Sequence, residues 1–112
     1  MYRIFVETSY FQRYIENLGD RSVLSEIQNI LLENAASGDI IPGTGGVRKL
    51  GIRDTARGKG KRSGFRVLYL DLPERNKTYL LWMYGKNESE DISPDEKKEI
   101  QTLVSMIKRE AQ

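Results

Sequence analysis

The chain has 112 residues, of which 38% are hydrophobic and 30% are charged, and its net charge is +2. This length predicts a single domain spanning residues 1–112, and no apolar run approaches the roughly 20 residues that cross a bilayer. The sequence contains no histidine and no cysteine, which excludes Ser-His-Asp and Cys-His catalysis, histidine- or thiolate-bound metal sites and disulfide bonds, and which fits a cytoplasmic protein.

The first half of the chain predicts one strand followed by two helices. Residues 2–7 (YRIFVE) are β-branched and aromatic, as in an opening strand, and they lack the regions of a signal peptide. Thr8 or Ser9 then caps a helix that stops at Gly19. A second apolar stripe predicts another helix, which ends near Gly38. The aromatic side chains of this half are expected in the core.

The second half predicts three strands and a closing helix. Residues 39–46 form a turn-rich connector. The strand-like segments that follow it are residues 47–53, 65–72 and 77–84. The last of these is apolar on both faces, as in a central strand. A strong helix start comes next, in which Ser93 is the cap, Pro94 is the first helical residue and Glu96 completes a capping box.

Together these elements predict an α+β domain in the order β-α-α-β-β-β-α. Three strands in series, joined by loops, form an antiparallel meander, and the first strand can join this sheet at an edge. We therefore expect one antiparallel sheet with the helices packed on one face.

Positive charge is concentrated in the glycine-rich segment of residues 43–66. Within it, residues 47–66 hold eight basic residues and one acidic residue, a local charge of +7, whereas the rest of the chain sums to −5. Glycines let the backbone approach a phosphate chain that basic side chains neutralise, so the segment predicts a nucleic-acid surface. The alternative is a solvated loop that only maintains solubility. The candidate RNA-binding side chains are Arg48, Lys49, Arg57, Lys59, Lys61 and Arg62.

The sequence predicts neither a metal site nor a cofactor site. Gly58-Lys59 is followed by Gly60, so the segment lacks the hydroxyl residue of a nucleotide-binding P-loop. An acidic turn ahead of a helix is a simpler interpretation than metal ligation for three carboxylates, Glu88, Glu90 and Asp91.

Three side chains form a candidate catalytic site. If residues 65–72 and 77–84 pair as a hairpin, Arg66 lies near the level of Tyr84, and Lys86 shares the parity of Tyr84. Metal-free RNA cleavage needs a base, an acid and cations around the phosphate. Arginine suits the phosphate, and a lysine crowded by other cations exchanges protons nearer neutrality. An internal salt bridge is the alternative role for Arg66. These residues alone predict a nucleic-acid binder and allow a ribonuclease.

At these residues the sequence resembles a known family. The runs GTGGVRKL, GKGKRSGFRVLYL and YLLWMYGKNESEDIS are similar to those of the RelE/HigB superfamily of bacterial toxins, most closely its HigB-type branch. The likeness covers nearly the whole chain and implies a RelE-like fold. It also implies a toxin of a type II toxin–antitoxin system, which enters the A site of the small ribosomal subunit and cuts translated mRNA through the 2′-hydroxyl, without metal.

The resemblance also implies partners and residue roles. A cognate antitoxin, of the helix-turn-helix type, would neutralise the toxin by direct binding and would alone contact operator DNA. By position, Arg66 falls on the scissile phosphate, and Tyr84 and Lys86 fall on the catalytic positions of the last strand. Lys59, Lys61 and Arg62 fall in the basic loop that would grip RNA, and one of these lysines is also a candidate for proton transfer. Relatives use a histidine near these positions and this chain has none, so the sequence does not assign which residue is the base and which the acid, and Lys86 is the favoured residue for this proton transfer.

Two alternatives follow from the same observations. Superfamily members of the ParE type lack the catalytic set and poison DNA gyrase instead. A non-catalytic RNA- or ribosome-binding module would use the basic segment for salt-sensitive binding alone.

Overall fold

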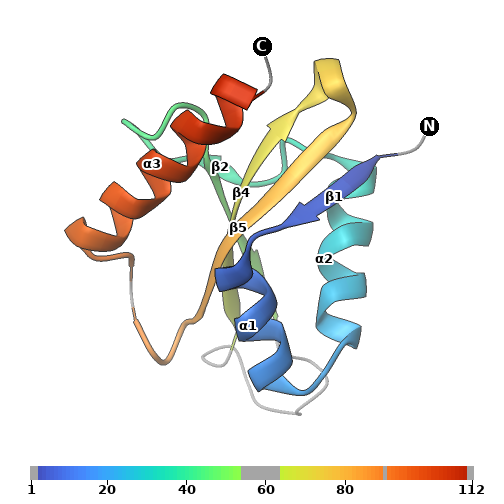
Figure 1. The fold of residues 1–112 in the computed structure, drawn as a ribbon. Helices are drawn as coiled ribbons and strands as arrows, with labels where there is room; N and C mark the ends of the chain where they lie inside the picture. Colours follow the sequence, from blue (N-terminus) through green and yellow to red (C-terminus); the bar gives the residue numbers. More distant parts are fainter. Residues whose placement is uncertain (1–2, 54–63, 90, 111–112) are drawn as a thin grey trace.

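The computed structural model describes residues 3–53, 64–89 and 91–110, and it has helices on both sides of a sheet (Figure 1). The elements in chain order are β1 (Ile4–Glu7), α1 (Ser9–Leu18), α2 (Ser22–Glu33), β2 (Asp39–Ile40), β3 (Arg48–Ile52), β4 (Phe65–Leu72), a 3₁₀ turn (Pro73–Arg75), β5 (Lys77–Gly85) and α3 (Pro94–Glu110). In the described part of the chain, no helix is long and apolar enough to cross a membrane.

The five strands form one mixed sheet in the order β1-β5-β4-β3-β2. The strands from β2 to β5 pair antiparallel with their neighbours, as a meander does. β1 joins at an edge, as predicted, but it runs parallel to β5, with Ile4 opposite Lys77. The prediction of a wholly antiparallel sheet is therefore wrong at this edge. Two helices and three strands separate β1 from β5, so no tight turn imposes an antiparallel pairing.

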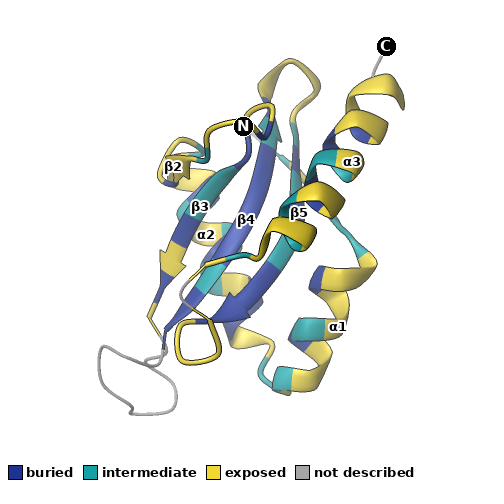
Figure 2. Ribbon diagram, turned by 90° about the vertical axis from the view of Figure 1, so that its left-hand side faces the viewer, coloured by how far each residue is buried: buried dark blue, intermediate teal, exposed yellow. Residues whose placement is uncertain are grey.

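The helices cover both faces of the sheet, so the prediction that they pack on one face is wrong. Side chains of α1 and α2 share a core with Phe65, Val67 and Tyr69 on one face of β4. Side chains of α3 share a second core with Leu68 and Leu70 on the opposite face. β4 is buried along nearly its whole length (Figure 2). A strand that is apolar on both faces needs both faces covered, which explains the three layers.

The first helix has the predicted ends. The Thr8 side chain accepts a hydrogen bond from the backbone N–H of Phe11, at 3.2 Å, and Gly19 adopts a left-handed φ of 73° at the C-terminal end. The third helix has its predicted capping box, because the Glu96 carboxylate accepts from the backbone N–H of Ser93 at 2.8 Å and Ser93 Oγ accepts from the N–H of Glu96 at 3.1 Å. Local sequence alone specifies these ends.

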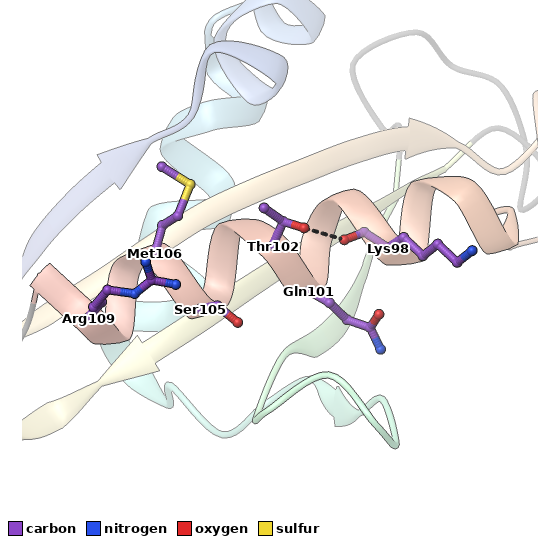
Figure 3. A pocket seen from close by; sticks show the side chains of 6 residues that line it. All are labelled: Lys98, Gln101, Thr102, Ser105, Met106 and Arg109. Atoms are coloured by element: carbon purple, nitrogen blue, oxygen red, sulfur yellow. Dashed lines mark hydrogen bonds between the residues drawn. The ribbon is translucent and has the colours of Figure 1, made fainter.

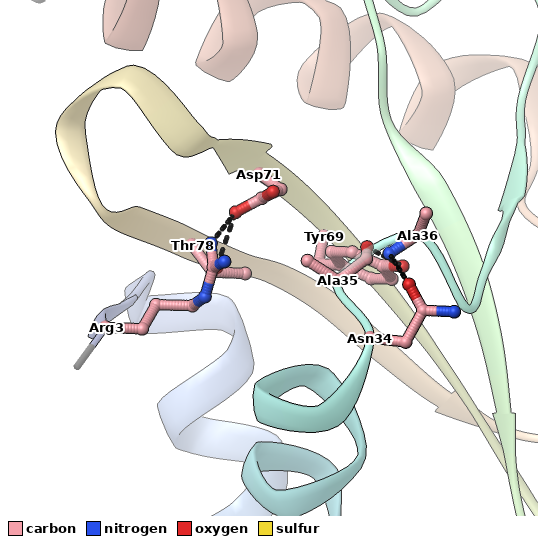
Figure 4. A network of polar contacts seen from close by, with 7 residues as sticks. All are labelled: Arg3, Asn34, Ala35, Ala36, Tyr69, Asp71 and Thr78. Carbon is pink, nitrogen blue, oxygen red and sulfur yellow. Dashed lines mark hydrogen bonds and ion pairs between the residues drawn. The ribbon is translucent and has the colours of Figure 1, made fainter. Parts of the chain in front are cut away.

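The second helix ends at Glu33, five residues before the predicted end near Gly38. The segment after it is held by the hydroxyl of the buried Tyr69. This hydroxyl donates to the carbonyl of Ala35 at 2.7 Å (Figure 4). It also accepts from the N–H of Gly38 at 2.9 Å. The side chain of Asn34 also accepts from the backbone N–H of Ala36 at 3.0 Å, so a local turn and a strand distant in sequence together hold the segment outside the helix.

Two further features of the sheet depend on tertiary contacts. Arg3, just ahead of β1, pairs with the Asp71 carboxylate of β4, which also accepts from the Thr78 hydroxyl of β5 at 2.9 Å (Figure 4). This contact ties the edge strand to the sheet. β2 was not expected, because its two residues are too short to show an alternating pattern.

Candidate active site

Arg66 and Tyr84 lie directly opposite each other in the register of β4 and β5. Both belong to the face of the sheet that α3 covers, because Arg66 shares the parity of Leu68 and Leu70 and Tyr84 belongs to the same core. A bulge in β5 contributes to this placement: Leu68 pairs with Trp82 and Tyr69 pairs with Leu80, so one β5 residue has no partner. The predicted level of Arg66 and Tyr84 is therefore confirmed, while their catalytic roles stay predictions.

Gly51 continues the same row across a third strand. It lies opposite Arg66 in the register of β3 and β4. A Cβ atom at Gly51 would lie 2.5 Å from Nη1 and 3.5 Å from Cζ of Arg66, so the guanidinium occupies the space that a side chain would take. Gly51 has no positive φ. The sequence therefore needs glycine here for room rather than for backbone conformation, and no pattern in the sequence indicated this role.

Arg66 forms no ion pair with any carboxylate of the described residues, whose ion pairs are Arg3–Asp71 and Lys49–Asp91. The internal salt bridge considered as an alternative role for Arg66 is absent from that part of the chain. Arg66 is nevertheless partly buried. A partly buried guanidinium without a carboxylate partner is suited to bind an external anion.

Tyr84 is 7% exposed, and its hydroxyl has no hydrogen-bond partner among the described residues. Burial raises the pKa of Tyr84 above its ordinary value of 10.0; the Asp91 carboxylate raises it further, and the Arg66 guanidinium lowers it. Near neutral pH the side chain is therefore a neutral phenol. It can donate a hydrogen bond, and it does not act as a phenolate base.

The neighbouring basic residues of β3 point to opposite faces. Arg48 donates to the carbonyl of Gly38 at 2.7 Å and shares its parity with Leu50 of the α1–α2 core, so the structure does not bring it to Arg66. Lys49 shares the parity of Gly51 and places its Nζ 3.9 Å from an Asp91 carboxylate oxygen. Of the two predicted RNA-binding residues in β3, only Lys49 lies on the face of Arg66.

Lys86 is exposed and begins the turn after β5. Its backbone N–H donates to the carbonyl of Gly64 at 2.8 Å, so the pairing of the two strands continues two steps beyond Arg66 and Tyr84. Ile52 pairs with Phe65 at the same end of the sheet. The part of the basic segment that connects β3 to β4 therefore begins and ends beside the candidate site. The predicted RNA-binding residues Arg57, Lys59, Lys61 and Arg62 lie outside the described residues.

A groove adjoins Tyr84 on the outer edge of β5, and the sequence did not predict it. It has a volume of 330 Å³ and is lined by residues of α1, β5 and the connector to α3. Tyr10 and Trp82 stack in it with ring centroids 4.7 Å apart, and Tyr10 is 39% exposed. The prediction that aromatic residues of the first half lie in the core is wrong for Tyr10. Tyr10 is outside the apolar stripe of its helix, which was the available signal.

A second hollow, of 490 Å³, lies on the outer side of α3 (Figure 3). Its polar and flexible side chains are Lys98, Gln101, Thr102, Ser105, Met106 and Arg109. None of them belongs to the row of Gly51, Arg66 and Tyr84, which lies under the opposite side of the helix. We assign no role to this hollow.

Comparison with known proteins establishes the fold. No family model matches the chain. Among solved structures, a mutant of the E. coli toxin RelE in the free state is similar, with a TM-score of 0.56 and 16% sequence identity over 80% of this chain and 90% of that chain. The chain therefore has the RelE-like α+β fold that the sequence resemblance implied, and the HigB-type assignment stays a prediction.

Proposed function

We propose that this chain is the toxin of a type II toxin–antitoxin system and an endoribonuclease that cuts translated mRNA in the ribosomal A site. The observation that carries the proposal is the pairing of Arg66 with Tyr84 beside Gly51. It places a guanidinium and a neutral phenol together at the end of the sheet where the basic segment begins and ends. The likeness to a toxin, RelE, supports the same conclusion.

The proposed reaction is an attack of the RNA 2′-hydroxyl on its own 3′-phosphate. The bond from O2′ to phosphorus forms and the bond from phosphorus to O5′ breaks, which leaves a 2′,3′-cyclic phosphate and a free 5′-hydroxyl. The 2′-hydroxyl proton passes to a base, for which Lys86 is the favoured residue, and an acid returns a proton to O5′. This route requires only side chains.

Each residue of the row has a distinct proposed role. Arg66 stabilises the charge that develops on the non-bridging phosphate oxygens, because its planar fork remains charged at any physiological pH. Tyr84 donates a hydrogen bond to the same phosphate from its hydroxyl, which has no partner among the residues that the structure describes. Lys49 and the basic segment hold the flanking phosphates.

The proposed partners follow from this surface. The ribosome presents the message in its A site, in the cytoplasm, and a cognate antitoxin binds the toxin directly and neutralises it. The antitoxin, of the helix-turn-helix type, would make any contact with operator DNA.

The test is mRNA cleavage in a reconstituted translation reaction, mapped by primer extension. We expect the wild-type chain to cut messages on ribosomes, with Arg66→Ala slower by about 100-fold or more, as for other lost transition-state contacts. Tyr84→Phe should also be slower. Wild-type rates in both variants would contradict the assigned roles. Inhibition of gyrase supercoiling with no cut message would contradict the ribonuclease proposal itself.

A further inference from the structure

The aromatic groove beside Tyr84 has the composition of a ligand site. Tyr10 and Tyr14 of α1 and Trp82 of β5 line it, so aromatic rings from two elements converge there. Its 330 Å³ lies at the small end of the range of about 300–1,000 Å³ for ligand pockets. Figure 1 shows α1 and the connector to α3 on either side of the lower part of β5.

The opening of the groove is fixed by a carboxylate. Glu88 accepts hydrogen bonds from the backbone N–H of Gly85, at 2.8 Å, and from the hydroxyl of Tyr14. These contacts hold the turn after β5 against α1. Because β1 pairs only with Lys77–Leu80, no strand within residues 3–53, 64–89 and 91–110 pairs with this edge of β5 beyond Leu80. The groove is therefore built into the fold by the short length of β1.

The charges of the groove indicate the kind of ligand. It is lined by one cation, Arg13, and two carboxylates, Glu88 and Glu96. This balance disfavours a phosphate and suits an uncharged ring that donates hydrogen bonds. Aromatic side chains stack on any nucleobase, and carboxylates accept hydrogen bonds from exocyclic amino groups.

We propose that this groove binds one unpaired purine nucleobase of the RNA, next to the phosphate held by Arg66. Tyr84 connects the two places, because it lines the groove and pairs with Arg66. A nucleotide whose phosphate contacts Arg66 can therefore place its base against the aromatic side chains of the neighbouring groove. A purine is favoured over a pyrimidine because its larger ring covers more of the aromatic surface. The inference extends the proposed function and rests on it for the source of the base.

The single tryptophan of the chain provides a direct test. Trp82 gives one indole N–H signal in a ¹⁵N-correlated NMR spectrum, and a base stacked in the groove shifts it. We expect adenosine 5′-monophosphate to shift the signal saturably, and ribose 5-phosphate, which lacks the base, to leave it in place. Uridine 5′-monophosphate should bind more weakly. Arg66→Ala should weaken the binding of adenosine 5′-monophosphate, because the phosphate of this nucleotide lies at Arg66.

Variants at Tyr10 separate ligand binding from folding. Tyr10→Leu removes the exposed ring and should weaken adenosine 5′-monophosphate binding about fivefold or more, whereas Tyr10→Phe keeps the ring and should bind as the wild type does. Thermal unfolding of both variants establishes that each is folded. An unmoved indole signal, or equal shifts with ribose 5-phosphate, would overturn the inference, and equal affinity for uridine 5′-monophosphate would overturn its purine preference.

The two proposals fail in different ways. Message cleavage on ribosomes without any shift of the Trp82 signal would refute the base site and leave the proposed function intact. A saturable shift without cleavage would support the base site and refute the ribonuclease.

Discussion

Gly51 contributes to the candidate site because it has no side chain, which leaves room for the guanidinium of Arg66. Replacing it with alanine places a Cβ 2.5 Å from Nη1 of Arg66. The guanidinium is the end of a flexible side chain, so it moves aside at little cost to the fold. We expect Gly51→Ala to leave stability unchanged or higher by about 0.5–1 kcal/mol, since glycine weakens a strand. We expect it to slow message cleavage by about 100-fold, because a misplaced phosphate clamp loses its alignment.

Thermal unfolding and ribosomal cleavage measured on the same preparations check this prediction. Gly38→Ala is the matched control: its Cβ would meet the backbone oxygen of Lys49 and the ring of Tyr69 at 2.9 Å each, which are groups that cannot move easily. This variant should lose stability. In an Arg66→Ala background, Gly51→Ala should have no further effect on cleavage. An additive loss there would show that Gly51 acts independently of Arg66.

The raised pKa of Tyr84 leads to a second prediction at the scale of one residue, which concerns the pH dependence of stability. Its pKa in the folded chain lies above the ordinary value of 10.0, through burial and then the Asp91 carboxylate. The unfolded chain therefore releases the phenol proton first as pH rises. The contribution of Tyr84 to stability is complete below about pH 10 and is lost as pH rises through the folded pKa. Urea unfolding between neutral pH and pH 11 should show this loss, and it should be smaller in Tyr84→Phe. An identical slope in both proteins would contradict the prediction.

At the scale of elements, the hydroxyl of Tyr69 and the side chain of Asn34 both hold the segment that follows α2. Tyr69→Phe removes the hydrogen bonds to Ala35 and Gly38 and leaves two backbone groups without that partner. We expect a loss of about 1–3 kcal/mol in the free energy of unfolding, measured in urea. Hydrogen exchange should rise at residues 35–38 more than in the centre of α2. Tyr79→Phe, on the opposite face of the sheet, is the control and should change neither quantity to the same extent.

The elements that sequence predicted well are those with local determinants. Thr8 and Gly19 bound one helix, and the largely apolar run Phe65–Leu72 predicts a strand whose limits agree with the structure. The pairing of Arg66 with Tyr84 followed from strand positions and a short connecting turn. The sequence was insufficient to predict features that depend on contacts between residues distant in the chain. The end of α2 depends in part on Tyr69, and the parallel β1 depends on an edge that only the complete sheet presents.

The candidate site was predictable only in part for a related reason. Arg66, Tyr84 and the basic segment carry their chemistry in their side chains and were visible in the sequence. Gly51 contributes by having no side chain, and the groove arises from Tyr10 and Trp82, which stand 72 positions apart in the chain. Neither leaves a motif, because both depend on which strands and helices are neighbours.

At the scale of the whole molecule, the three layers decide which face can bind RNA. α1 and α2 bury one face of β3, and Arg48 is bonded to backbone on that face. α3 packs on part of the other face, where Gly51, Arg66 and Tyr84 lie in a row, Gly51 is exposed and Lys49 is paired loosely with Asp91. If RNA approaches the face of Arg66, the adjacent residues Lys49 and Arg48 of β3 must contribute unequally to binding, with Lys49 contributing more.

Lys49→Ala and Arg48→Ala test this arrangement as a matched pair that removes one charge each. Binding of a 2′-O-methyl RNA oligonucleotide, which cannot be cleaved, is measured over a series of salt concentrations. Lys49→Ala should reduce the slope of log affinity against log salt by about 0.7, because one phosphate contact is lost. Arg48→Ala should retain the wild-type slope and instead lose about 1 kcal/mol of stability with its hydrogen bond to Gly38. The reverse result would place RNA on the face of α1 and α2, where neither Arg66 nor Tyr84 can contact it.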